Sequence, residues 1–109
     1  MEFAFATLEL RSICESRKKA VAEIGTDAAR ELGDRLADLE ACATVAEFTG
    51  LFPESVVVLS QSERAIKLVE NCQLSFCSGH VKVPKMPSGE MDWAKVSRIK
   101  ITSVGCQNA

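Results

Sequence analysis

In residues 98–104, which read Arg-Ile-Lys-Ile-Thr-Ser-Val, polar and apolar side chains alternate from Arg98 to Thr102. Successive residues of a strand point to opposite faces of a sheet, so Ile99 and Ile101 share one face and Arg98 and Lys100 the other. The alternation predicts a strand with one face in the core and one in water. The polar face is cationic although the chain has a formal charge of −2.

Three segments upstream also read as strands, because they are rich in Val, Ile or Phe and bounded by turn-forming residues; they are residues 55–60, 65–69 and 73–77. Their hairpin-like spacing predicts an antiparallel sheet with a turn at Glu70-Asn71. Alternation assigns these residues to the core: Ile66, Leu68, Cys72, Leu74, Phe76, Ile99 and Ile101. It assigns these to the opposite face: Lys67, Gln73, Ser75, Arg98, Lys100 and Thr102.

The first half of the chain has helical rather than strand periodicity. A short strand within residues 1–7 precedes one helix over residues 10–24 and a second over residues 27–43, separated by Gly25. Thr44-x-x-Glu47 has the spacing of a capping box and predicts a brief helical turn. Together these elements predict a single α+β domain, residues 1–109, with an N-terminal helical hairpin packed on a small antiparallel β-sheet.

Charge divides unevenly between the two halves of the chain. Up to Glu54 there are 6 Lys/Arg against 11 Asp/Glu, and after it 7 against 4, which gives −5 and +3. The basic half is able to attract a phosphate backbone despite the acidic total. A polar sheet face is also what solubility alone requires, so a solvated surface remains the alternative interpretation.

Five cysteines are an odd number without a C-x-x-C pair, and the chain has one histidine to complete a metal set. They are interpreted as free thiols, and no metal site or other cofactor is expected. Residues 1–10 lack the basic start of a signal peptide, and no apolar run approaches the ~18 residues of a membrane span. A cytoplasmic protein without a membrane partner is therefore expected.

Three strings in chain order resemble the RelE/HigB-like toxins, the "killer protein" branch of the ParE/RelE superfamily of type II toxin–antitoxin systems. Residues 34–48 (DRLADLEACATVAEF) resemble the second helix and the turn after it. Residues 65–84 (AIKLVENCQLSFCSGHVKVP) resemble the central hairpin and following loop, and residues 92–101 (DWAKVSRIKI) are the most specific match. The resemblance spans about residues 8–104 and implies the RelE/ParE toxin-like fold.

The resemblance implies an mRNA interferase, a toxin that enters the ribosome and cuts mRNA through attack of the 2′-hydroxyl without a metal. It also implies a helix-turn-helix antitoxin as partner, through which alone the toxin meets DNA. The catalytic candidates are His80, Arg98 and Lys100. The candidates for RNA binding are Lys67, Gln73, Lys82 and Lys85.

Two positions depart from the family pattern. Gln73 stands near the position where the family carries a phosphate-binding arginine, and the chain has no tyrosine for the family's acidic–Tyr–His tail. The alternative is therefore a toxin-fold protein that acts by binding alone, to its antitoxin or to a target such as gyrase. An antitoxin role for the chain itself is disfavoured, because the pattern turns to strands after Phe48. Trp93 is expected to anchor its loop to the core rather than to stack on a base.

Overall fold

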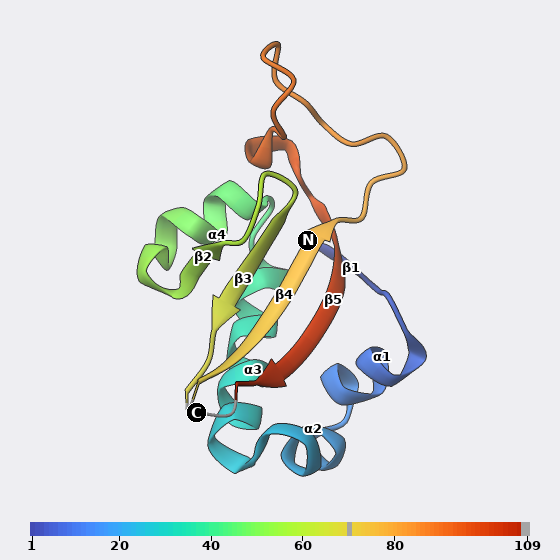
Figure 1. Cartoon of the computed structure of the whole chain (residues 1–109), viewed down its shortest axis with the longest axis vertical. Helices are drawn as coiled ribbons and strands as arrows, with labels where there is room; N and C mark the ends of the chain where they lie inside the picture. Colours follow the sequence, from blue (N-terminus) through green and yellow to red (C-terminus); the bar gives the residue numbers. More distant parts are fainter. Residues whose placement is uncertain (70, 108–109) are drawn as a thin grey trace.

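In a computed structural model that describes residues 1–69 and 71–107, the chain has an α+β fold with helices on one face of a mixed sheet (Figure 1). The strand order is β1-β5-β4-β3-β2. The strands are β1 (Glu2–Phe5), β2 (Val56–Val58), β3 (Glu63–Lys67), β4 (Cys72–Ser78) and β5 (Arg98–Cys106). The helices are α1 (Leu8–Glu15), α2 (Arg17–Ile24), α3 (Thr26–Ala41) and α4 (Val45–Leu51), with single 3-10 turns η1 (Pro53–Ser55) and η2 (Trp93–Lys95).

The expected short strand near the N-terminus forms as β1, but it makes the sheet mixed rather than antiparallel. β1 lies parallel to β5, with Phe3 opposite Ile99 and Phe5 opposite Ile101. The whole helical region separates the two strands in sequence, and a parallel pair needs such a long connection. The other three strand pairs are antiparallel, as expected.

The single helix expected over residues 10–24 is wrong, because this segment forms two helices, α1 and α2. Ser16 adopts an extended conformation between α1 and α2, and its hydroxyl accepts a hydrogen bond from the backbone N–H of Lys19 at 3.3 Å. A side-chain oxygen that caps a new helix competes with continuation of the old one. α3 then starts after Gly25, which has φ +86°, as the glycine stop predicts.

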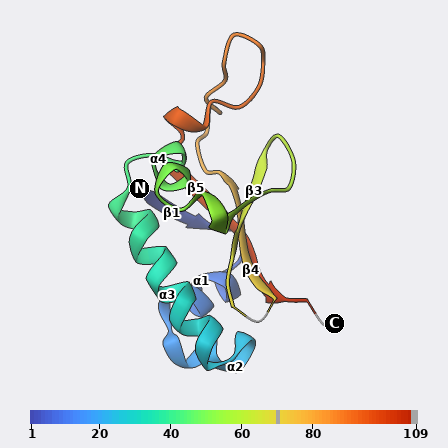
Figure 2. The ribbon, with the colours of Figure 1, turned by 90° about the vertical axis from the view of Figure 1, so that its left-hand side faces the viewer.

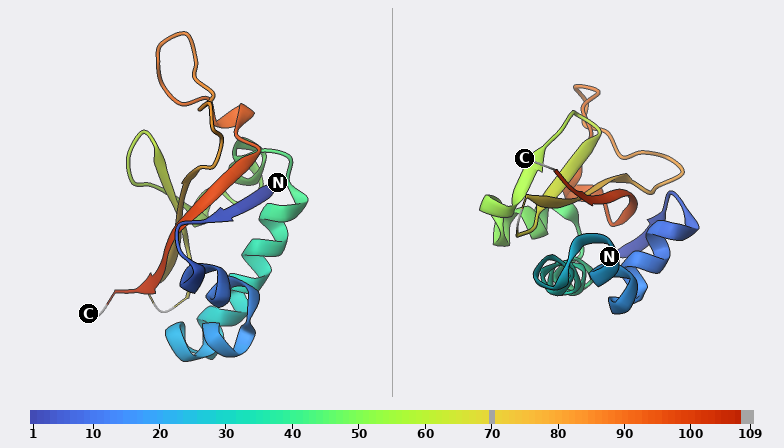
Figure 3. Two further views of the ribbon diagram at one scale, coloured as in Figure 1. Left: turned by 90° about the vertical axis from the view of Figure 1, so that its right-hand side faces the viewer. Right: turned by 60° about the horizontal axis from the view of Figure 1, so that its bottom comes forward.

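The helices all lie on one side of the sheet, and none of the described residues forms a helix on the other side (Figures 2 and 3). We call the side facing the helices the covered face and the other side the open face. All seven residues assigned to the core from the sequence are buried, with exposures from 0 to 7%. Helix residues such as Leu32, Leu39 and Phe48 pack on them in one cluster. The capping box also forms, since Thr44 Oγ1 accepts from the N–H of Glu47.

A bulge in β5 alters the predicted open face. The register between β4 and β5 shifts between Ser75 and Phe76, so Ser75 lies opposite Ser103 while Phe76 lies opposite Ile101. Thr102 is the extra residue, and beyond it the alternation is reversed. The open face therefore carries Ser103 in the position expected for Thr102.

The bulge also brings Cys106 opposite Cys72, and the two form a disulfide across 34 residues. The interpretation of five free thiols is therefore wrong, and Cys14, Cys42 and Cys77 are the free ones. The spacing of the cysteines in the sequence does not predict this pair, because Cys72 and Cys106 become neighbours only through the register of β4 and β5. The expected turn before Cys72 includes Asn71, with φ +61°; Glu70 lies outside the described residues. No described helix has the length and apolar character that a membrane span requires.

Candidate nucleic-acid interface

The open face has a floor of small side chains in its centre. Ala65, Ser75 and Ser103 lie side by side on β3, β4 and β5. Ala65 is fully buried and Ser75 is 4% exposed although no helix covers them. Their neighbours shield them, so of these three side chains only that of Ser103 is exposed to a ligand on this face.

Hydroxyl groups line this floor. Ser75 Oγ and Ser103 Oγ are hydrogen-bonded, and Thr102 Oγ1 donates to Ser75 Oγ at 3.3 Å. Strand alternation predicts Ser75 on the open face but misses Ser103. The signal that could have found it is the adjacent polar pair Thr102-Ser103, where the alternation of β5 breaks. Hydroxyls both donate and accept, so this cluster suits phosphate oxygens or the 2′-hydroxyl of RNA.

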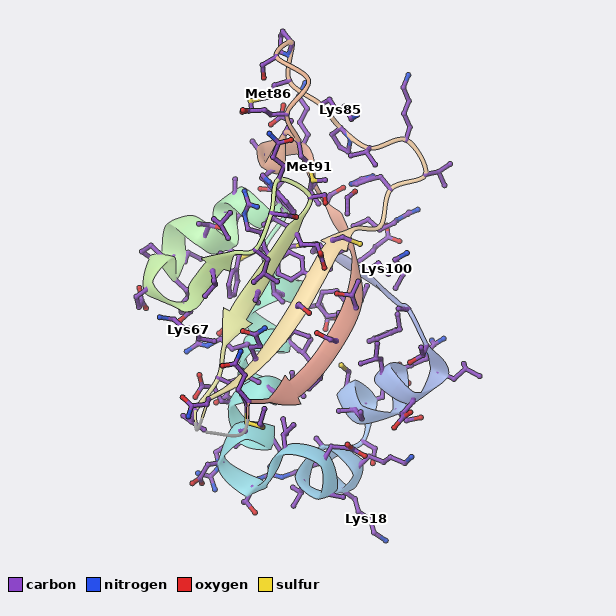
Figure 4. All side chains as sticks on the ribbon, viewed as in Figure 1. Lys18, Lys67, Lys85, Met86, Met91 and Lys100 are labelled. Atoms are coloured by element: carbon purple, nitrogen blue, oxygen red, sulfur yellow. A yellow bond between two sulfur atoms is a disulfide. The ribbon has the colours of Figure 1, made fainter. Side chains whose placement is uncertain are left out.

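Lysines lie diagonally on the two sides of the floor. Lys67 projects from the end of β3, in register with Gln73, and Lys100 projects from β5, in register with Cys77 (Figure 4). Both lysines are exposed, and no described carboxylate forms an ion pair with either. Three of the sequence-predicted residues, Lys67, Gln73 and Lys100, therefore lie on one surface, and two of them are free cations.

Where the chain leaves β4, residues 79 and 80 lie against the start of β5. The N–H of Gly79 donates to the carbonyl of Arg98 at 2.7 Å, and a Cβ on Gly79 would come within 3.0 Å of the Ile99 backbone. Glycine is thus required for this close crossing. The crossing places His80 where its Nε2 accepts a hydrogen bond from the N–H of Ser97 at 3.1 Å. The proton of the neutral ring is then on Nδ1.

Arg98 is not a free cation. Its Nη2 donates to both carboxylate oxygens of Glu2, at 3.2 and 3.1 Å. The two residues are neighbours because β1 pairs in parallel with β5. Sequence reasoning missed Glu2, since the contact joins residues 96 positions apart. A phosphate would have to displace the carboxylate to reach Arg98.

The remaining candidates, Lys82 and Lys85, lie in the loop between β4 and η2. This loop projects beyond the end of the sheet (Figures 1 and 4). An isolated antiparallel β-bridge joins Lys85 and Met91 on the two sides of the loop. Both lysines are exposed, but they belong to a different part of the surface from Lys67. Lys82 and Lys85 thus lie apart from the other five predicted residues.

Trp93 anchors its loop, as expected. Its ring meets the ring of Phe76 edge-on, with centroids 6.2 Å apart, and the guanidinium of Arg64 lies 4.4 Å from its centroid. Burial lowers the pKa of Arg64, which was not a candidate from the sequence. Within residues 1–69 and 71–107 no cluster of three His, Cys, Asp or Glu is placed to hold a metal ion.

In comparisons with known proteins, no family model, no curated protein and no solved structure matched this chain. Over residues 1–69 and 71–107 it is an α+β protein with a sheet face that no helix covers and that bears hydroxyls and the unpaired Lys67 and Lys100.

Proposed function

We propose that this chain is a RelE/HigB-like toxin that acts on mRNA at the ribosome and receives the RNA on its open face. The observation that carries the proposal is the floor of Ala65, Ser75 and Ser103 between the unpaired cations Lys67 and Lys100. Cations that are free of carboxylate partners gain most from phosphate contact, because they give up only counterions. The sequence resemblance over residues 8–104 gives the same assignment.

Cleavage through the 2′-hydroxyl requires a positioned backbone, a cation at the phosphate and groups that move two protons. Lys100 is the cation best placed for the phosphate, and the Ser75–Ser103 pair can orient the ribose. His80 is the proton-transfer group in this proposal, with Nδ1 as the exchanging atom because Nε2 holds the Ser97 N–H. No cofactor takes part in the chemistry.

A second candidate is binding without cleavage, to the antitoxin, to RNA or to another target such as gyrase. The pairing of Arg98 with Glu2 favours it, because it neutralises one of the three catalytic candidates. The position of Gln73 on the open face, where the family carries an arginine, also favours it. A cytoplasmic toxin with a helix-turn-helix antitoxin is the setting for both candidates.

The test uses ribosomes stalled on a defined mRNA, with 5′ ends mapped after addition of the purified chain. We expect cleavage at the A-site codon and a loss of about three- to tenfold in RNA affinity for Lys100→Ala at low salt. Lys18→Ala is the matched control, since Lys18 is an exposed lysine on α2, away from the open face (Figure 4). Each arm is run with and without dithiothreitol, because a reducing compartment keeps cysteines as thiols.

Three results separate the candidates. Cleavage that falls with Lys100→Ala and not with Lys18→Ala supports the toxin. RNA binding that depends on Lys100 in the absence of any cleavage leaves the binding protein. Equal effects of the two substitutions would show that the open face has no special role, and would overturn both forms of the RNA proposal.

A further inference from the structure

The edge of the sheet formed by β2 lacks the usual protection of an exposed strand. β2 is the terminal strand, and its three residues are all valine. Val58 is 67% exposed and the next residue, Leu59, is 45% exposed. Natural edge strands usually carry a charge, a proline or a bulge that prevents further pairing. Within β2 itself none of these is present.

The hydrogen-bonding groups of this edge point outward at two residues. The N–H of Leu59 donates to the carbonyl of Glu63, and the register pairs Val57 with Ala65. Backbone groups in an antiparallel ladder alternate in direction, so those of Val57 face β3 and those of Val56 and Val58 point away from the sheet. The N–H and C=O groups of these two residues can therefore hydrogen-bond to an added strand.

A hollow of about 430 Å³ lies beside this edge, on the side of the covered face. Val45, Pro53, Val56 and Trp93 are among its lining residues, so most of its wall is apolar. A side chain delivered by an added strand would enter it, because residues opposite Val56 point to the same side of the sheet.

Arg64 borders the same hollow and has a free side. Its Nη1 donates to the carbonyls of Ser60 at 2.7 Å and Glu63 at 3.1 Å. Among the ion pairs of the described residues none includes Arg64. A guanidinium is always protonated and has five donors, so this one can accept an anion beside Ser60.

We propose that a second copy of this chain covers this edge, with the two β2 strands antiparallel and Val57 of each copy at the two-fold axis. In this register Val56 lies opposite Val58 of the other copy, and the outward groups of both strands pair. The exposed Val58 enters the apolar hollow beside Val56. The arrangement is isologous, so each contact occurs twice.

Charge complementarity between Glu54 and Arg64 favours a second copy of this chain as the partner at this edge. The register brings Glu54, in the turn before β2, opposite Ser60 of the other copy, where Arg64 holds the Ser60 carbonyl. Glu54 is exposed and no described ion pair includes it. Each copy thus supplies the carboxylate that the other copy's Arg64 lacks.

The axis of such a pair is perpendicular to the sheet, so a ten-stranded sheet results and both open faces point to the same side. This inference goes beyond the proposed function and does not depend on RNA binding. Because β2 has only three residues, the contact falls below the area of a typical stable dimer and the association is weak. A cross-link detects it better than gel filtration.

The experiment places a cysteine on the axis. Residues opposite each other at a non-hydrogen-bonded position have Cα atoms about 4.5 Å apart, which allows a disulfide. We expect Val57→Cys to form a linked dimer at least about tenfold faster than Val81→Cys under the same oxidant. Val81 is fully exposed in the projecting loop, so its variant measures random collision.

Charge variants keep the proposal falsifiable. Glu54→Arg faces Arg64 of the other copy and should reduce cross-linking of Val57→Cys several-fold, whereas Leu8→Arg, on exposed α1, should not. Equal cross-linking of Val57→Cys and Val81→Cys would overturn the proposal. So would faster cross-linking of Val58→Cys than of Val57→Cys, because the register would then differ by one residue. Circular dichroism of each variant confirms its fold.

Discussion

The two faces of the sheet are made by the same strands but follow different rules. On the covered face, Leu74, Phe76 and Ile99 are fully buried and packed against helices. On the open face, Lys67 and Lys100 are exposed and Ser75 is buried only by its neighbours. The strands β3, β4 and β5 each supply residues to both faces.

The difference teaches which substitutions report on folding and which report on function. The covered face is constrained by volume, so almost any change there alters the free energy of unfolding. The open face is constrained by charge and hydrogen bonding, so changes there alter what the chain binds. Four predictions test how far this separation holds.

The largest effect is expected at the centre of the covered face. Phe76→Ala should lower the free energy of unfolding by about 3–5 kcal/mol, because it removes a fully buried ring and leaves a cavity against Trp93. Lys67→Ala, on the open face of the next strand, should change it by less than about 0.5 kcal/mol. Urea denaturation measures both, and similar losses for the two variants would contradict the separation of the faces.

The second largest effect is expected at the disulfide between the start of β4 and the end of β5. Cys106→Ser should lower the free energy of unfolding by about 3 kcal/mol under oxidising conditions, because the 34-residue link restrains the unfolded chain. With excess reductant, wild type and variant should unfold at the same urea concentration. A difference that persists in reductant would mean that Cys106 stabilises the fold by packing and not by the bond.

Alkaline pH should weaken the helical layer more than the open face. Burial, and then the charge of Glu15, raises the pKa of Cys14 from 9.0 to about 11. A raised folded-state pKa contributes stability that is complete below pH 9 and is lost as the pH rises towards 11. The urea midpoint should therefore fall more between pH 8 and 10.5 for wild type than for Cys14→Ala. Burial also raises the pKa of Cys42, so the variant keeps part of the dependence.

The smallest expected effect on stability lies at the Glu2–Arg98 pair. Both side chains are exposed, at 74% and 45%, so Glu2→Gln should change the free energy of unfolding by less than about 1 kcal/mol. It frees Arg98, however, and should strengthen RNA binding about two- to threefold at low salt. Filter binding against wild type measures this gain. A loss of binding would show that the ion pair positions the site.

Particular residues show how much the sequence predicts. Alternation in residues 98–101 places Ile99 and Ile101 in the core correctly, because a strand's period depends on local backbone geometry. The same rule fails one residue later at Thr102, where the bulge shifts the register. The helical period in residues 10–24 is real, but the segment forms two helices. The hydroxyl of Ser16 caps the second helix, and the periodicity of apolar residues does not show this break.

The candidate site was predictable only in part. Lys67, Gln73 and Lys100 share the open face as alternation predicts, whereas Lys82 and Lys85 lie in a separate loop. The seven candidates include no partner for Arg98, because its partner Glu2 is 96 residues away. Nor do they include Arg64, whose environment comes from Trp93 and from the turn before β3.

By itself the sequence determined the α+β class, the residues of the core and the cationic character of the last strand. Each depends on a short-range period or cap that neighbouring residues establish together. The tertiary structure alone decided the parallel pairing of β1, the Cys72–Cys106 bond and which cations remain unpaired. These depend on strand register, and a shift of one residue changes every cross-strand neighbour without changing the local pattern.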